Sequence, residues 1–109
     1  MFPKNRRIPR KMFPLLKKGK MYKNNLFLIK IASQPDPSSR FCFSVSKKIA
    51  KNAVMRNKMR RAGYRLLKNY IDKIKPNYLT FFSFRMIPKD DTEIIKNIES
   101  ALLESKLIK

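Results

Sequence analysis

Histidine is absent from the 109-residue chain, and cysteine and glycine are scarce, with one and two residues. Without histidine, the usual general base and every Ser-His or Cys-His nucleophile arrangement are excluded. The single cysteine, Cys42, cannot form an internal disulfide, and its place in the apolar run 41–43 predicts a small buried side chain. Gly19 and Gly63 are far apart and belong to no phosphate-binding glycine motif. We therefore expect no protein-bound organic cofactor and no metal site.

Long apolar runs are also lacking, because the longest uninterrupted stretches span only a few residues. A membrane-spanning helix needs about 20 such residues, so we expect no membrane partner. Residues 1–23 are basic and free of acids, but they contain three prolines and no apolar segment typical of a signal peptide. We interpret them as part of the mature protein, and the isolated cysteine fits a reducing, cytoplasmic location.

Acidic residues are few: seven stand against 27 lysines and arginines, which gives a formal charge of +20. Residues 1–71 contain 20 of the basic residues and a single acid, Asp36, whereas residues 72–109 are close to neutral. Charge segregated in this way weakens a compact monomer by self-repulsion, which a phosphate backbone would relieve. The charge predicts a polyanionic partner, with nucleic acid ahead of an anionic membrane.

Hydrophobic periodicity divides the chain into six elements. We predict a short helix over 11–18, strands over 25–32 and 40–46, a helix over 52–75, a strand over 77–87 and a helix over 90–106. The turn-forming residues 33–39 predict an antiparallel hairpin between the first two strands. The expected organisation is one α+β domain over 1–109 in the order α-β-β-α-β-α, with 1–10 as a basic tail capable of flexibility.

The same periodicity assigns the core faces. One strand face carries Phe27, Ile29 and Ile31, and one face of the next strand carries Phe41, Phe43 and Val45. The predicted apolar stripe of the long helix comprises Met55, Met59, Ala62, Leu66 and Tyr70, widened by Leu67, Ile71 and Ile74. The position of this stripe decides which residues of the helix face solvent.

The solvent arc of the long helix is strongly basic. It carries Asn52, Arg56 and Arg60 at four-residue spacing, with Asn57, Arg61 and Arg65 beside them. Guanidinium groups pair bidentately with phosphate and stack on bases, and asparagine offers both a donor and an acceptor. A merely solvated helix face usually carries interspersed acids, but none lies between Asp36 and Asp72. The arc therefore favours RNA binding.

Two segments carry a resemblance to a known family. Residues 43–49, Phe-Ser-Val-Ser-Lys-Lys-Ile, and 52–61, Asn-Ala-Val-Met-Arg-Asn-Lys-Met-Arg-Arg, resemble the signature of the bacterial ribonuclease P protein subunit. The basic N-terminal helix, the order of elements and the length resemble the family too. The resemblance implies a small α/β sandwich in which a mixed sheet packs on the long basic helix through a left-handed crossover.

The resemblance also implies a function. The RNA subunit of ribonuclease P, using Mg²⁺, removes the 5′ leader from precursor tRNA, and the protein is its noncatalytic partner. The protein binds the catalytic RNA and the single-stranded leader, with one protein for each RNA and a monomer when alone. No residue of the protein is then catalytic.

Residue roles follow from the motif and from the basic arc. The expected RNA-binding residues are Lys47, Lys48, Lys51, Asn52, Arg56, Asn57, Lys58, Arg60, Arg61 and Arg65. For Lys51 a purely solvated role is the alternative. Lys58 stands where the family motif has arginine, which keeps the charge and loses the planar fork.

The leader groove is expected to take Phe13, Lys30 and Tyr22. Met12 is the rival of Phe13, and core packing is the alternative role for Phe13, Met12 and Tyr22. Lys30 occupies a position where family members often place an aromatic residue, so it would replace base stacking by a phosphate contact.

Three other classes of protein remain as alternatives. A small basic ribosomal or other structural RNA-binding protein shares the size, charge and mixed structure. A self-sufficient nuclease would need clustered acids to hold metal, whereas the acids here are few and lie mostly near the C-terminus. A DNA-binding helix-turn-helix is disfavoured because no short helix and turn precede the basic helix.

Overall fold

The computed structural model describes residues 2–108 as one α+β fold. Its strands are β1 (Lys20–Lys23), β2 (Phe27–Ser33), β3 (Arg40–Ser44) and β4 (Tyr78–Phe84), and its α-helices are α1 (Ala53–Leu67) and α2 (Asp91–Glu104). Three 3-10 helices complete it: η1 (Lys4–Arg6), η2 (Arg10–Lys18) and η3 (Lys68–Lys73). All six predicted elements are present, and β1 and η1 are additional.

The four strands form a mixed sheet in the order β1-β2-β4-β3. Strand β4 pairs antiparallel with β2, Phe27 opposite Phe84, and parallel with β3, Phe43 opposite Phe82. The predicted hairpin between β2 and β3 is therefore wrong, since β4 separates them. The physical reason is that β4 is apolar on both faces, so the sheet gains most by enclosing it in the centre.

The real hairpin joins β1 to β2. The Asn24 side chain accepts hydrogen bonds from the backbone N–H groups of Leu26 at 3.1 Å and Phe27 at 2.8 Å, and this fixes the turn. Strand β1 was missed in the sequence because Lys20–Lys23 is short and mostly exposed, and so lacks an apolar alternation.

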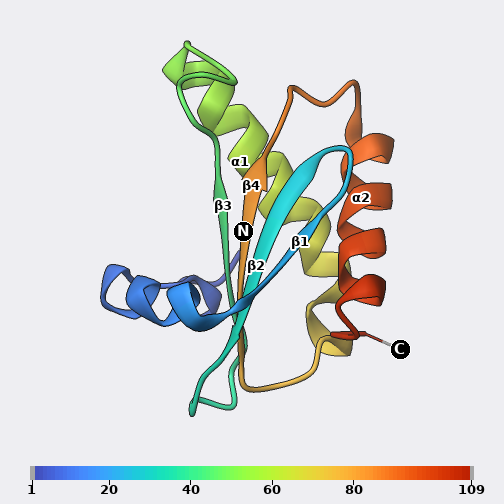
Figure 1. The fold of residues 1–109 in the computed structure, drawn as a ribbon. Coiled ribbons are helices and arrows are strands. Elements are labelled where there is room, and N and C mark those ends of the chain that lie inside the picture. The colour runs from blue at the N-terminus through green and yellow to red at the C-terminus, as the bar shows by residue number, and fades with distance from the viewer. Residues whose placement is uncertain (1, 109) are drawn as a thin grey trace.

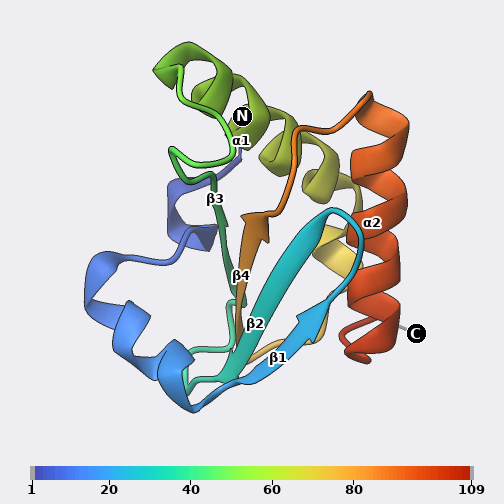
Figure 2. The same cartoon turned by 45° about the horizontal axis from the view of Figure 1, so that its top comes forward.

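Helices α1 and α2 both cover one face of the sheet, as Figures 1 and 2 show. The centre of this core is a cluster of phenylalanines in which Phe43 stacks on Phe82 with ring centroids 4.7 Å apart. Phe27 meets both Phe82 and Phe84. Buried aromatic groups of this kind contribute more than their area alone. The predicted inward faces of β2 and β3 are confirmed.

The first turns of α1 depart from the predicted stripe. Met59 is buried at 3% exposure, but Met55, four residues earlier, is 37% exposed. The reason is that α1 begins beyond the edge of the sheet, so its first turn has no strand beneath it (Figure 1). The regular α-helix ends at Leu67 and continues to Lys73 only as η3, two residues short of the predicted end.

The N-terminal segment lies against the edge strand β3. Phe2 is buried in the main core, and the Ile8 N–H donates to the carbonyl oxygen of Phe41 at 3.1 Å. On the outer face of the sheet, η2 covers a second, smaller cluster of Ile8, Leu16, Ala32 and Leu79. Residues 2–10 thus pack on the domain, while Met1 lies outside the described residues.

The connection from β3 to β4 runs through α1 and η3 and joins two neighbouring parallel strands. This is the connection for which the resemblance predicts a left-handed crossover.

Candidate nucleic-acid interface

A defined cap fixes the start of the basic helix. The side chain of Asn52 accepts a hydrogen bond from the backbone N–H of Val54 at 2.7 Å, as expected of an N-cap asparagine. The cap fixes where α1 begins, while the buried side chains of Met59, Leu66 and Leu67 fix which face of the helix turns to solvent. Lys47, Lys48 and Lys51 are exposed in the turn that leads into this cap.

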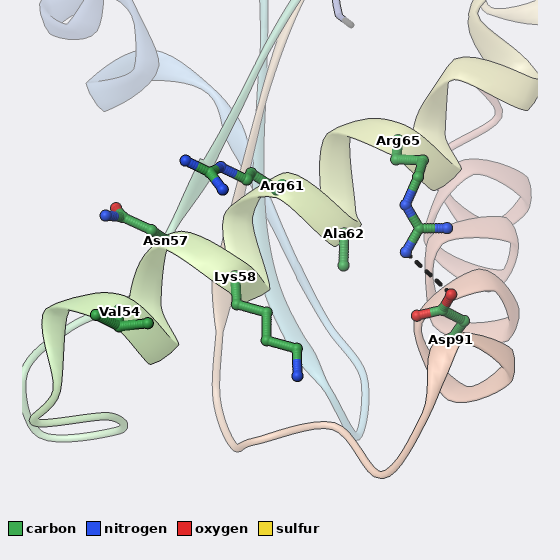
Figure 3. A pocket seen from close by; sticks show the side chains of 7 residues that line it. All are labelled: Val54, Asn57, Lys58, Arg61, Ala62, Arg65 and Asp91. Atoms are coloured by element: carbon green, nitrogen blue, oxygen red, sulfur yellow. Dashed lines mark hydrogen bonds and ion pairs between the residues drawn. The ribbon is translucent and has the colours of Figure 1, made fainter.

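The solvent arc of α1 presents cations as the sequence predicted. Asn57, Lys58 and Arg61 are all exposed, and Figure 3 shows Asn57 and Arg61 extending to one side of α1 and Lys58 to another. Arg60 is half-buried, and its guanidinium donates to the side-chain oxygen of Asn57. The exposed arc is a surface suited to phosphates.

Two of the predicted RNA-binding arginines, Arg56 and Arg65, form bonds within the protein. The guanidinium of Arg56 turns back and donates to the carbonyl oxygens of Ala50 at 2.9 Å and Lys51 at 2.8 Å, which ties the basic turn to the helix. Arg65 forms an exposed ion pair with Asp91 of α2 at 3.0 Å (Figure 3). Their charges are therefore partly used within the protein.

A groove of about 450 Å³ opens on the outer face of the sheet, opposite to the main core. Its walls come from η2, from strands β2, β3 and β4, and from α1. The lining residues are Phe13, Leu16, Lys17, Lys30, Cys42, Phe43, Ser44, Arg60 and Phe81. Aromatic groups and three cations thus share one open concave surface.

The register of the sheet explains which residues meet in this groove. Lys30 and Cys42 both stand opposite Phe81, so the three side chains share one face. Phe13 of η2 meets the ring of Phe81 edge-on, with centroids 6.1 Å apart. Phe13 and Lys30 are therefore brought together. Met12 is partly buried against the small core beneath η2.

Tyr22 does not lie in the groove. It stands opposite Ile29, so the two side chains share the face of the sheet that carries the main core, which is the face away from the groove. Its alternative role in the core is the one the structure shows.

Sequence reasoning missed Phe81, Cys42 and Lys17 as groove residues. Cys42 was expected to be a buried side chain, but it is only partly buried, and Phe81 is partly buried as well. The available signal was the alternation within β4, since Phe81 and Phe82 must point to opposite faces. The strand order decides which residues of the neighbouring strands lie beside Phe81, and the sequence alone does not show that order.

Burial changes the acidity of two groups near the groove. It raises the pKa of the Cys42 thiol above its usual value, so the thiol stays neutral. It also raises the pKa of Tyr64, whose hydroxyl oxygen accepts from the backbone N–H of Phe43 at 3.1 Å. Neither group carries negative charge near neutral pH, so neither offsets the cations around it.

Metal and membrane features were sought within residues 2–108. No group of three or more cysteine, aspartate or glutamate side chains is placed there to hold a metal ion. Over the same residues, no helix combines the length and apolarity that crossing a membrane requires.

The fold and the site define a small basic α+β protein with a cationic helix beside an aromatic groove. The sequence model of the Ribonuclease P family matches residues 2–106. The Ribonuclease P protein component of Clostridioides difficile (strain 630) is 39% identical over 89 residues, which cover 79% of this chain and 74% of that protein. The chain therefore belongs to the Ribonuclease P family, as the resemblance indicated, and has the role of a ribonuclease P protein subunit.

Solved structures agree with this assignment. A mutant RNase P protein of Staphylococcus aureus superposes with a TM-score of 0.85 at 26% identity, covering 96% of this chain and 92% of that one. The RNase P protein of Thermotoga maritima shares the fold, with a TM-score of 0.69 at 21% identity over 91% of this chain and 93% of that one. Membership of this family implies RNA binding and tRNA processing, and it displaces the ribosomal alternative.

Proposed function

We propose that this protein is the noncatalytic subunit of a bacterial ribonuclease P and binds both the catalytic RNA and the 5′ leader of precursor tRNA. The observation that carries the proposal is the continuity between the groove and the basic helix. Arg60 lines the groove, while its neighbour Arg61 lies on the exposed arc. A single strand in the groove would therefore lie directly beside an RNA bound to α1.

The groove has the chemistry that a leader of any sequence requires. The rings of Phe13 and Phe81 give apolar surface against which bases stack, and every base has a π-face. Lys17, Lys30 and Arg60 supply positive charge for the backbone. Nothing in this lining offers a base-specific pattern of donors and acceptors, so affinity without sequence preference is expected.

The RNA-binding surface of α1 comprises Asn57, Lys58, Arg60 and Arg61, with Lys47, Lys48, Lys51 and Asn52 before them. Arg56 contributes mainly by holding the turn through its bonds to Ala50 and Lys51. Arg65 contributes less than a free arginine because Asp91 is paired with it. In this proposal the RNA subunit and its Mg²⁺ cleave the precursor tRNA. One monomeric protein associates with each RNA, and the particle acts in the cytoplasm.

Replacing Lys30 by alanine tests the groove. We expect Lys30→Ala to weaken binding of a precursor tRNA with a 5′ leader to the reconstituted particle and to lower the salt slope by about 1, because one phosphate contact is lost. Binding of a tRNA without a leader should not change. The matched control is Lys96→Ala, which removes the same charge from the exposed side of α2. Equal effects on both substrates would contradict the placement of the leader.

A further inference from the structure

A second hollow, of about 500 Å³, lies between the N-terminal segment and the later turns of α1. It is separate from the leader groove, because Arg60 points into the groove while Arg61 lines this hollow. The lining residues are Phe2, Arg7, Arg61, Tyr64, Arg65 and Lys68. We call this feature the Arg7 hollow. Its volume is within the range of sites that hold small organic groups.

Aromatic groups form the floor of the Arg7 hollow. The rings of Phe2 and Tyr64 lie with centroids 5.0 Å apart, and Phe2 is buried. Tyr64 is held from below, because its hydroxyl oxygen accepts from the Phe43 N–H. The guanidinium of Arg7 lies over the Tyr64 ring, 4.6 Å from its centroid. A planar cation thus already lies over a fixed ring, and because Arg7 is exposed, its guanidinium is accessible to a second planar group.

The rim of the hollow is cationic. Arg7, Arg61, Arg65 and Lys68 stand around it, and all four are exposed. Within residues 2–108, only Arg65 of these four forms an ion pair, with Asp91. Three cations without an ion-pair partner therefore surround an aromatic floor. A peptide of ordinary composition does not combine a planar group with the negative charge that this arrangement would bind. A nucleotide does, since it joins a planar base to a phosphate.

We propose that the Arg7 hollow binds one unpaired nucleotide of the catalytic RNA. The base stacks on the Arg7 guanidinium above Tyr64, and the flanking phosphates lie against Arg61 and Lys68. The inference rests on the proposed function, since it assumes an RNA subunit. It adds Arg7, Tyr64 and Lys68 to the contact surface and gives the N-terminal segment a direct part in RNA recognition.

The first test compares two doubly substituted proteins. Arg7→Ala/Lys68→Ala removes two charges from the hollow, and Lys73→Ala/Lys96→Ala removes two exposed charges from the nearly neutral segment 72–109. We measure binding to an in vitro transcribed bacterial ribonuclease P RNA over a series of KCl concentrations. The first pair should weaken binding roughly tenfold and lower the salt slope by about 1 to 2, and the control pair should do neither. Equal behaviour of the two pairs would overturn the proposal.

A second variant separates stacking from charge. Arg7→Lys keeps the positive charge but loses the planar group, so affinity should fall while the salt slope stays as in the parent protein. Chemical probing of the RNA should reveal one nucleotide that the parent protein protects and that Arg7→Lys and Arg7→Ala leave reactive. If Arg7→Lys binds and protects the RNA like the parent protein, the base does not stack there and the proposal fails.

RNA binding by the unsubstituted protein separates failure of this proposal from failure of the proposed function. If the unsubstituted chain does not bind the RNA, the proposed function fails and the Arg7 hollow loses its ligand with it. If the unsubstituted chain binds and only the hollow variants are without effect, the proposed function stands and the hollow proposal alone is wrong. Circular dichroism and thermal unfolding of each variant confirm that the fold is retained.

Discussion

At the scale of single residues, Gly19 shows how a close approach constrains the sequence. Gly19 follows the last residue of η2, and its φ of −80° is open to any residue. A Cβ at this position would instead lie 2.3 Å from the carbonyl oxygen of Ile31. That atom belongs to the backbone of β2, which pairs with β1 at this point. Glycine is therefore required by space and not by dihedral angle.

We expect Gly19→Ala to lower the free energy of unfolding by about 1 to 3 kcal/mol, because β1 must move away from β2 to admit the methyl group. Urea unfolding followed by circular dichroism measures the change. Ser100→Ala, on the exposed side of α2, is the control and should leave stability nearly unchanged. A Gly19→Ala protein as stable as the parent would show that the two strands are not in this close contact.

Two methionines of α1 provide a matched pair. Met59→Asp should abolish folding, because a carboxylate would be buried at a site with 3% exposure and no partner. Met55→Asp should remain folded, since Met55 is 37% exposed on the first turn. Far-ultraviolet circular dichroism and gel filtration distinguish the outcomes. Unfolding of both proteins would restore the original sequence prediction, in which both methionines face the core.

At the scale of elements, periodicity predicted six of the segments that form strands and helices, but it missed β1 and η1 and did not show how the strands pair. The alternation in 25–32 and 40–46 correctly identified the buried faces, including Phe27 and Phe43. The turn-rich residues between them suggested a hairpin. The local sequence does not show that a strand beginning at position 78 lies between these two strands in the sheet. Pairing is decided by the whole sheet, which buries its most apolar strand centrally.

Capping gives an element-scale prediction for α1. Asn52→Ala removes the acceptor of the Val54 N–H and should lower the free energy of unfolding by about 1 kcal/mol. Asn52→Asp keeps an acceptor beside the positive end of the helix and should retain stability. Both are measured by urea unfolding without RNA. If Asn52→Ala has no effect on stability, the cap is not what fixes the beginning of α1.

At the scale of the whole molecule, the charge of +20 affects stability as well as binding. Within residues 2–108 only two ion pairs form, Arg40 with Asp36 and Arg65 with Asp91. Most cations therefore repel one another across a small domain. Such repulsion is screened by salt over about 10 Å at 0.1 M.

The melting temperature should consequently rise as NaCl is increased from low to moderate concentration. The rise should be smaller in Lys47→Gln/Lys48→Gln, where two exposed neighbouring cations are removed. Differential scanning calorimetry of both proteins in the same salt series provides the measurement. A melting temperature that is flat or falls with salt would mean that self-repulsion contributes little to the stability of the fold.

One part of the candidate site was predictable from the sequence, and the other part depends on how the strands and helices assemble. The cationic arc was predictable because neighbours on a helix follow from sequence spacing alone. The groove was predictable only in part, through Phe13 and Lys30, because it forms where η2, three strands and α1 meet. Phe81 and Cys42 join it through strand register, and Tyr22 is excluded from it for the same reason.

The most direct test of the central claim is cleavage of precursor tRNA by a bacterial ribonuclease P RNA at low Mg²⁺, with and without this protein. Substrates that carry or lack a 5′ leader are compared under the same conditions. The protein should restore cleavage, and the restoration should be stronger for the substrate with a leader. Absence of rescue by a folded protein that binds the RNA tightly would contradict the account.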